Sequence, residues 1–268
     1  MKSIFSLLCL MILTFTAKAQ VDTLSEKQNT ATADDPSQFF TRIELFNELQ
    51  YKDDGSYLNM TTLRNNVKIG KRFTTRLDVM YVSNSLAKGT NYQQSGLGDI
   101  SFRLLGYRFF ESPRSAFTAS VEISLNTAQS PVLGLGKNVF IPMVTYSRIF
   151  KDKKMLLATV FQQANSFSGD ADRATLSFSK IQFGILNFWS KKMWSVIIPE
   201  FYVDYVLGGF SMNLEGRIAY APTSRTNFWI TAGAGIFGDF MFCYKLSGEA
   251  GYRYYLFRKP SLKSRADK

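Results

Sequence analysis

Apolar and polar side chains alternate along the last regular stretch of the chain, residues 240–257. The even positions are mostly apolar: Phe240, Phe242, Tyr244, Leu246, Gly248, Ala250, Tyr252, Tyr254 and Leu256. The odd positions from 245 to 253 are mostly polar: Lys245, Ser247, Glu249, Gly251 and Arg253. Strand side chains alternate between two faces, so this stretch predicts a strand with one apolar and one charged face. Such a strand fits a soluble β-sandwich. It also fits an outer-membrane barrel whose apolar face contacts lipid and whose charged face lines a water-filled lumen.

A series of strand-like stretches precedes this one, separated by residues typical of turns. Their spacing fits strands of about ten residues, which cross a bilayer when tilted. The twelve expected stretches are 39–51, 58–70, 72–83, 98–110, 115–126, 138–150, 154–164, 174–189, 193–207, 209–221, 226–237 and 240–257. The sequence therefore predicts an all-β fold: a closed antiparallel transmembrane β-barrel of about twelve strands, with up-and-down topology. Pairing the last strand with the first leaves no open edge in lipid.

The connections between these stretches differ systematically in length. Every second connection is short: residues 70–72, 111–114, 151–154, 190–192 and 221–225. The intervening ones include the long segments 84–97, 126–137 and 165–173. Short periplasmic turns and longer external loops characterise outer-membrane barrels, whereas a soluble sandwich has no reason to alternate this way.

Aromatic residues concentrate beside the short connections, as expected for a belt at one membrane interface. The members of this expected belt are Phe73, Phe109, Phe110, Phe117, Phe150, Trp189, Trp194, Tyr220, Phe228, Trp229, Tyr254, Tyr255 and Phe257. The alternative is that they are ordinary core aromatics. Core residues would not stay at one end of every hairpin, so the pattern favours the belt.

Charged residues of both signs occupy the face predicted to line the lumen. On the expected registers they are Arg42, Glu44, Glu48, Arg64, Lys68, Arg76, Asp78, Arg103, Glu122, Glu200, Asp204, Glu215, Arg217, Lys245, Glu249 and Arg253. A lumen of about twelve strands is narrow beside those of 16- to 18-stranded porins, so opposite charges can pair across it. Two hypotheses follow: a passive channel for a small solute, and a non-transporting structural or surface-interaction barrel with a salt-bridged interior. Stretches near residues 142, 157 and 185 are apolar on both faces or mixed, which leaves their orientation open.

The two ends of the chain carry export signals. Residues 1–19 contain a basic start, an apolar run and Ala17-Lys18-Ala19, which predict a Sec-dependent signal peptide. Near the other end, Glu249, Gly251, Tyr254 and Leu256 fit the polar-x-Gly-x-x-aromatic-x-hydrophobic pattern, similar to the signal that barrel-insertion machinery recognises. The expected location is therefore the outer membrane of a Gram-negative bacterium. Residues 258–268 form a polar, basic tail after this signal.

Residues 20–38, between the signal peptide and the expected barrel of residues 39–257, are polar and contain few large apolar side chains. This composition predicts a flexible periplasmic segment. A small plug that enters the lumen is the alternative interpretation.

Composition narrows the chemistry further. The chain contains no histidine, which excludes Ser-His-Asp and Cys-His catalytic sites and removes the commonest metal ligand. We expect no enzyme, cofactor or metal site, although a lysine or carboxylate base would need no histidine. The net charge of +11 favours lipopolysaccharide, anionic solutes or simple solubility, since an exported protein rarely meets nucleic acid. The expected barrel also has the lipid bilayer as a partner. Gly233-Ala234-Gly235-Ile236-Phe237-Gly238 has the letters of a dinucleotide fingerprint but lies in a strand-like stretch with no helix after it.

One outer connection resembles a known family. Ser95-Gly96-Leu97-Gly98-Asp99-Ile100 leads into a strand with Tyr107-Arg108-Phe109, followed by Ser124-Leu125-Asn126-Thr127-Ala128 and by Gly134-Leu135-Gly136. This order is similar to that in the outer-membrane barrel family named after the meta-cleavage pathway of phenol degradation. The proline and glycine of that family's middle motif are replaced here. The resemblance covers residues 60–257 and implies a β-barrel that takes up small solutes, including aromatic or hydrophobic ones. It also implies that Gly96, Gly98 and Asp99 form a structured outer rim, with Asp99 accepting backbone hydrogen bonds.

Overall fold

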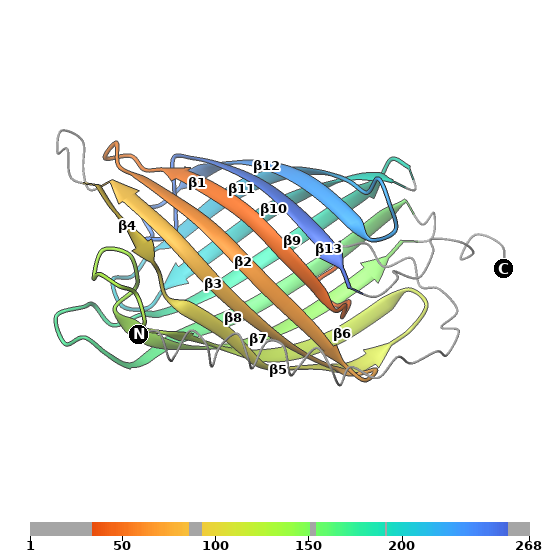
Figure 1. Cartoon of the computed structure of the whole chain (residues 1–268), viewed down its shortest axis with the longest axis horizontal. Coiled ribbons are helices and arrows are strands. Elements are labelled where there is room, and N and C mark those ends of the chain that lie inside the picture. The colour runs from red at the N-terminus through yellow and green to blue at the C-terminus, as the bar shows by residue number, and fades with distance from the viewer. Residues whose placement is uncertain (1–33, 86–92, 151–153, 191, 257–268) are drawn as a thin grey trace.

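The computed structural model describes residues 34–85, 93–150, 154–190 and 192–256, which form an elongated barrel of tilted strands (Figure 1). The expected signal peptide, the first part of the 20–38 segment and the basic tail lie outside the described residues. The strands are β1 (Arg42–Tyr51), β2 (Tyr57–Ile69), β3 (Phe73–Ser85), β4 (Gln93–Leu97), β5 (Ile100–Glu111), β6 (Ser115–Leu125), β7 (Lys137–Ile149), β8 (Met155–Gly169), β9 (Ser177–Phe188), β10 (Met193–Asp204), β11 (Phe210–Tyr220), β12 (Thr226–Phe237) and β13 (Leu246–Tyr255).

The sheet closes on itself, as the sequence predicts. β1 pairs antiparallel with β13 over its whole length, from Arg42 opposite Tyr255 to Tyr51 opposite Leu246, and pairs with β2 on its other side. β4 and β5 both pair with β3 and together form one position in the wall. The prediction of a closed antiparallel barrel of twelve strands is therefore confirmed. Closure satisfies the backbone groups of the first and last strands without an exposed edge.

Two of the expected long loops are shorter than predicted because the strands continue into them. β3 runs to Ser85, where it pairs with Gln93 of β4, inside the connection expected over 84–97. β8 runs to Gly169, which lies opposite Lys137 of β7. Polar residues fit a strand wherever a partner strand continues beside them, so composition alone placed these boundaries too early.

The final stretch of the sequence divides into two parts with different orientations. From Leu246 onward the alternation holds: Leu246 is exposed outside, whereas Glu249 and Arg253 point inward. Phe240, Phe242 and Tyr244 do not belong to the strand, and the prediction that they face lipid is wrong. They lie in a turn between β12 and β13 and fold into the barrel.

The glycines of the fingerprint-like segment explain this inward fold. A Cβ at Gly235 would lie 2.1 Å from the carbonyl oxygen of Tyr244, and one at Gly233 would lie 2.8 Å from its hydroxyl group. The inner face of β12 is therefore bare enough for the 240–245 turn to pack against it. These glycines make room for close backbone approach and have no nucleotide-binding context.

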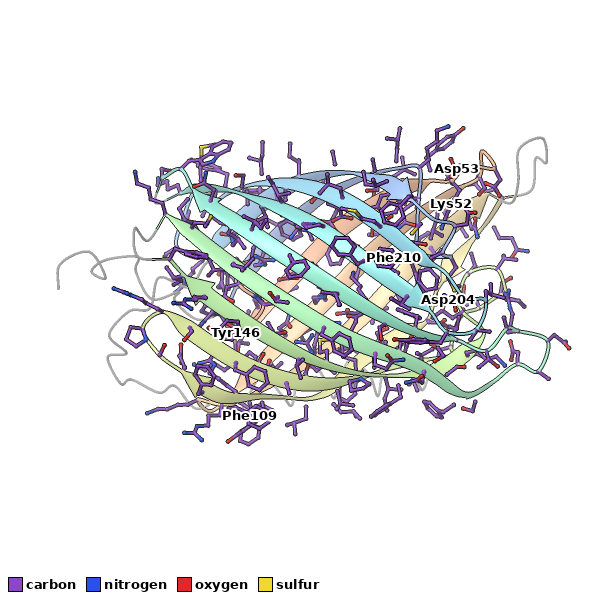
Figure 2. All side chains as sticks on the ribbon, turned by 180° about the vertical axis from the view of Figure 1, so that it is seen from behind. Lys52, Asp53, Phe109, Tyr146, Asp204 and Phe210 are labelled. Carbon is purple, nitrogen blue, oxygen red and sulfur yellow. The ribbon has the colours of Figure 1, made fainter. Side chains whose placement is uncertain are left out.

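The outer surface is rich in exposed apolar side chains, including Phe109, Tyr146 and Phe210 (Figure 2). Expected belt residues that are exposed near the short connections are Phe73, Phe109, Phe110, Phe150, Trp189, Tyr220 and Phe228. Three others, Trp194, Trp229 and Tyr255, are buried inside the barrel, so their assignment to the belt is wrong. They occupy inward positions of β10, β12 and β13. The prediction used only their closeness to a turn in the sequence, which does not show whether a side chain points into the barrel or out of it.

Among the described residues, no helix is long and apolar enough to cross a membrane.

Candidate functional site in the lumen

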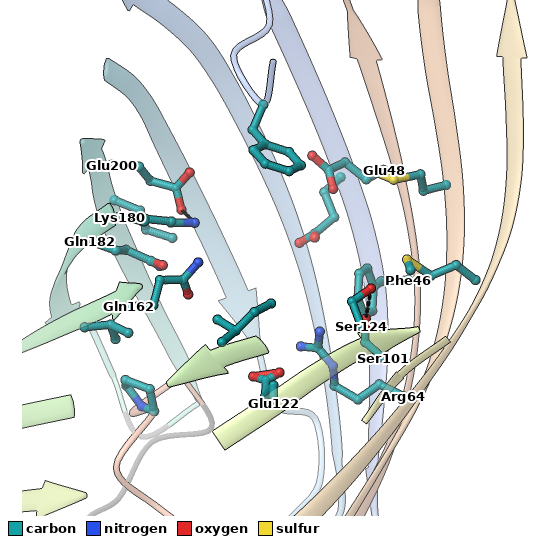
Figure 3. Close-up of a pocket in the computed structure, with 18 of the residues that line it drawn as sticks. Phe46, Glu48, Arg64, Ser101, Glu122, Ser124, Gln162, Lys180, Gln182 and Glu200 are labelled. Atoms are coloured by element: carbon teal, nitrogen blue, oxygen red, sulfur yellow. Dashed lines mark hydrogen bonds and ion pairs between the residues drawn. The ribbon is translucent and has the colours of Figure 1, made fainter. Parts of the chain in front are cut away.

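The barrel encloses a cavity of about 1040 Å³ that is lined by side chains from both halves of the chain. Glu48, Glu122 and Glu200 point toward it together with Arg64 and Lys180 (Figure 3). Of the residues that the sequence assigns to the lumen, those on the cavity wall are Arg42, Glu48, Arg64, Arg76, Arg103, Glu122, Glu200, Glu215, Arg217, Glu249 and Arg253. Glu44 and Asp78 are also inside, buried behind arginines with which they form ion pairs.

Two of the expected lumen residues lie elsewhere. Lys245 is exposed just before β13, where its backbone N–H donates to the carbonyl oxygen of Tyr51. Asp204 ends β10, and its Oδ1 accepts hydrogen bonds from the backbone N–H groups of Val206 and Leu207. Asp204 therefore caps a turn instead of facing the cavity, because the strand ends at that residue.

A continuous chain of ion pairs follows one side of the wall, from β13 through β1, β2, β3 and β5 to β6. Its carboxylates are Glu44, Asp78 and Glu122, each shared by at least two arginines. In order, the pairs are Arg253 Nε–Glu44 Oε1 at 2.5 Å, Arg42 Nε–Glu44 Oε1 at 2.6 Å, Arg64 Nη1–Glu44 Oε2 at 3.8 Å, Arg64 Nη2–Asp78 Oδ2 at 2.8 Å, Arg76 Nε–Asp78 Oδ2 at 3.2 Å, Arg76–Glu122, and Arg103 Nη2–Glu122 Oε1 at 2.9 Å. Because each of these carboxylates bridges arginines from different strands, the chain fixes side-chain positions across the wall.

A second arginine group surrounds Trp229 of β12. The guanidinium groups of Arg217 and Arg253 lie 5.6 and 4.9 Å from the centre of an indole ring of Trp229. The indole N–H donates to Glu249 Oε1 at 2.5 Å, and Arg217 Nη2 donates to the same oxygen at 2.8 Å. Directly opposite Trp229 is Gly251, where a Cβ would lie 2.1 Å from the indole ring. Gly251 is thus the residue that lets the ring lie flat against the wall.

The segment 34–38 lies inside the short-turn end of the barrel, the end with connections 70–72, 112–114, 150–154, 189–192 and 221–225. Asp34 accepts a hydrogen bond from the indole N–H of Trp194 at 2.5 Å, and its Oδ1 lies 3.4 Å from Arg217 Nη1 and 3.3 Å from Arg253 Nη1. Residues 34–38 of the segment predicted to be flexible therefore lie inside the barrel, where the alternative interpretation places a small plug. The sequence missed Asp34 because a short polar segment without periodicity shows no sign of burial.

Further contacts fix this segment in the lumen. Ser37, fully buried, is hydrogen-bonded through its hydroxyl group to that of Ser147 at 2.6 Å, and its carbonyl oxygen accepts from Arg108 Nη2 at 3.3 Å. The Arg108 guanidinium also stacks over Phe39 at 4.8 Å. Burial alone would raise the pKa of Asp34, but Arg253 and Arg217 more than compensate and hold the pKa below its ordinary value. Asp34 is therefore an anion at neutral pH.

The opposite side of the lumen near this end is apolar. Buried side chains of β8, β9 and β10 face inward here: Leu156, Ala158, Leu186, Trp194, Val196 and Ile198. The sequence left the orientation of β8 and β9 open, near residues 157 and 185, because Leu157 and Ile185 on their outer face are apolar as well. The lumen thus combines one apolar wall with one wall of paired charges.

Toward the long-loop end, the end with connections 126–136, 170–176 and 238–245, carboxylates face the cavity. Glu200 accepts hydrogen bonds from Lys180 Nζ at 2.5 Å and from the Tyr202 hydroxyl at 2.8 Å. Glu215 accepts one from the Tyr244 hydroxyl at 2.5 Å. The sequence did not single out Lys180, since its stretch alternates poorly.

Two segments fold inward at the long-loop end. Phe240 and Phe242 pack on Phe178, with ring centres 5.0 and 5.2 Å apart. On the other side, Leu133 and Leu135 of the 126–136 loop line the cavity.

The 126–136 loop is held by Asp99, which is buried between β4 and β5. Its Oδ1 accepts from the backbone N–H groups of Thr127 and Ala128 at 3.0 and 3.1 Å, and its Oδ2 accepts from that of Leu135 at 2.6 Å. These are backbone hydrogen bonds of the kind that the family resemblance implies for Asp99. Gly98 and Gly96 leave room for the same loop, since a Cβ at Gly98 would lie 3.1 Å from the carbonyl oxygen of Leu133 and one at Gly96 would lie 2.5 Å from Gln129.

The barrel is similar in fold to several solved structures. An outer-membrane channel from Pseudomonas putida F1 matches with a TM-score of 0.67 and 13% identity, over 86% of this chain and 99% of that one. The fold is that of an outer-membrane β-barrel. The NanC porin matches with a TM-score of 0.58 and 9% identity, over 80% of this chain and 100% of the porin. The KdgM porin in complex with disordered oligogalacturonate matches with a TM-score of 0.57 and 10% identity, over 81% and 99% of the two chains.

Comparisons of sequence add no family assignment. No family model matches the chain, and no curated protein matches it either. In the part of the chain that the structure describes, no group of three or more Cys, Asp or Glu side chains is placed to hold a metal ion.

Proposed function

We propose that this protein is an outer-membrane channel through which a small solute passes without energy input. The observation that carries this proposal is the cavity of about 1040 Å³ inside a closed wall, lined by charged groups of both signs and by an apolar surface. A purely structural interior would be expected to fill such a volume with side chains, since protein interiors are close-packed. The similar fold of porins and channels supports the same class of function.

The proposed location is the outer membrane of a Gram-negative bacterium, reached through the Sec pathway and the barrel-insertion machinery. Support comes from the exposed apolar exterior and from Tyr254, which lies on the outward face of β13 as the insertion signal requires. Leu256 lies just beyond β13 and donates its backbone N–H to the carbonyl oxygen of Thr41. Heat-modifiable migration on a gel and extraction by detergent alone test this location. Recovery as a soluble periplasmic protein would refute it.

Planar-bilayer conductance of the purified full chain tests the channel function. Asp34 lies in the cavity at the short-turn end and Phe242 at the long-loop end. We therefore expect a small conductance from the unmodified protein and a larger one from Asp34→Asn and Phe242→Ala. Complete absence of conductance from all three proteins would rule out a channel.

The second candidate is a non-transporting structural or surface-interaction barrel. The specific observation that favours it is the chain of ion pairs from Arg253 to Arg103, which satisfies most charges of one wall within the protein. This candidate predicts that solutes bind nowhere in the lumen and that liposomes containing the protein do not swell in any small solute.

We propose no enzymatic reaction for the chain. The meta-pathway resemblance supports a solute that is at least partly aromatic or hydrophobic.

A further inference from the structure

The environment of Asp34 has the chemistry of a carboxylate-binding site. Two guanidinium groups, from Arg217 and Arg253, and the indole N–H of Trp194 converge on its oxygens. All three donors belong to barrel strands, whereas Asp34 belongs to a segment outside any strand. Charge-assisted hydrogen bonds from arginine are the usual means by which proteins recognise carboxylates.

The barrel strands supply too little negative charge for these arginines. Glu44 is the other carboxylate paired with Arg253, and it is shared with Arg42 and Arg64. Along the whole chain of ion pairs, three carboxylates (Glu44, Asp78 and Glu122) face five guanidinium groups. A buried charge without a counter-charge is strongly disfavoured. Arg217 pairs with Glu249 at 2.8 Å, so the deficit falls on the chain that ends at Arg253, and an anion at the position that the Asp34 carboxylate now occupies reduces it.

The space beside this position suits an apolar body. Asp34, Arg217 and Arg253 all line the cavity of about 1040 Å³. The adjacent wall carries the inward side chains of Val196 and Ile198. A molecule with a carboxylate on the arginines and an apolar ring or chain on this wall would satisfy both surfaces at once.

We propose that Arg217, Arg253 and the indole N–H of Trp194 form a binding site for the carboxylate of a small solute with an apolar body, and that Asp34 is the internal occupant which such a solute displaces. This proposal rests on the proposed channel function and specifies the class of solute. Asp34 is tethered close to the site, so its effective concentration is high and a free carboxylate competes poorly with it. Removal of the Asp34 charge should therefore reveal the site.

Calorimetric titration of the detergent-solubilised full chain with benzoate tests the proposal, with benzyl alcohol as the uncharged probe of the same ring. We expect Asp34→Asn to bind benzoate at least tenfold more tightly than the unmodified protein, and benzyl alcohol no more tightly. Asp53→Asn is the matched control, since Asp53 is exposed in the β1–β2 turn at the other end of the barrel (Figure 2). It should bind benzoate as the unmodified protein does.

A second arginine variant identifies the site. Adding Arg217→Gln to Asp34→Asn should abolish the gain in benzoate affinity, and Asp34→Ser should reproduce the gain with a different side chain. The proposal is overturned if both Asp34 variants bind benzoate no better than the unmodified protein, or if benzyl alcohol gains equally. Calorimetry measures binding and does not depend on transport through the barrel. Conductance together with equal binding of benzoate and benzyl alcohol would refute this site alone. Benzoate binding without any conductance would refute the channel alone.

Discussion

Gly251 of β13 and Trp229 of β12 lie directly opposite each other, and the indole ring covers the bare glycine backbone. This contact connects three features: the position of Trp229, the two arginines beside its ring and the site of Asp34. The glycine of the expected insertion signal thus also has a role in the folded lumen.

Gly251→Ala should destabilise the barrel by about 1–3 kcal/mol, because the added methyl group forces Trp229 from the wall. Urea unfolding, followed by heat-modifiable migration on gels, would measure the change. Gly248→Ala in the same strand is the control, since no described atom lies within 4 Å of a Cβ there. Equal effects of the two substitutions would show that the Trp229 contact is unimportant.

Glu122→Gln should reduce the free energy of unfolding by roughly 3–5 kcal/mol, because it leaves the guanidinium groups of Arg76 and Arg103 without their shared carboxylate in a buried place. Glu111→Gln is the comparison, since Glu111 is 28% exposed and pairs with Arg108 at the end of β5. A partly exposed pair contributes about 0–1 kcal/mol. Denaturant titration of both variants would decide, and similar losses would contradict a special role for the buried chain.

Asp99→Asn should loosen the 126–136 loop while the barrel stays closed. The amide of asparagine replaces one acceptor oxygen by an N–H₂ group, which repels the backbone N–H groups now bound to Asp99. Hydrogen exchange should become at least tenfold faster in residues 126–136 and remain unchanged in β1 and β13. Asp53→Asn, in the exposed β1–β2 turn, should leave this exchange unaltered.

Asp34→Asn should shift the ion selectivity of the conductance toward anions, since the freed guanidinium groups of Arg217 and Arg253 face the cavity. The reversal potential in a tenfold salt gradient measures the shift. Phe242→Ala should instead raise conductance without changing selectivity, because Phe242 obstructs the long-loop end without a charge. An identical reversal potential for the Asp34 variant and the unmodified protein would argue against this account of the short-turn end.

Much of the lumen was predictable where alternation was clear. Glu122 and Arg217 sit in strands whose neighbouring positions alternate without exception, so period two placed both on the cavity wall. Lys180 and Leu186 belong to β9, whose sequence mixes polar and apolar residues on both faces. Their orientation followed from pairing with neighbouring strands, a relationship that one strand's sequence does not contain.

The last strand and the segment before the first show where sequence information ends. Alternation correctly indicated that Glu249 and Arg253 face inward, but it continued through Phe240 and Tyr244, which fold into the barrel. Asp34 carried no periodic signal at all. Turns and short polar segments are positioned by the space and the charges that other elements offer them.

The sequence by itself determined the barrel, its twelve wall positions and the inward face of its clearest strands, because these follow from the two-residue period of a strand and from the alternation of connection lengths. Only the tertiary structure decided which charges meet, that Asp34 lies between Arg217 and Arg253, and that Phe242 lies in the cavity at the other end. The physical reason is that closure of the sheet brings residues more than 180 positions apart into contact, and such contacts depend on strand order and register, which no local pattern encodes.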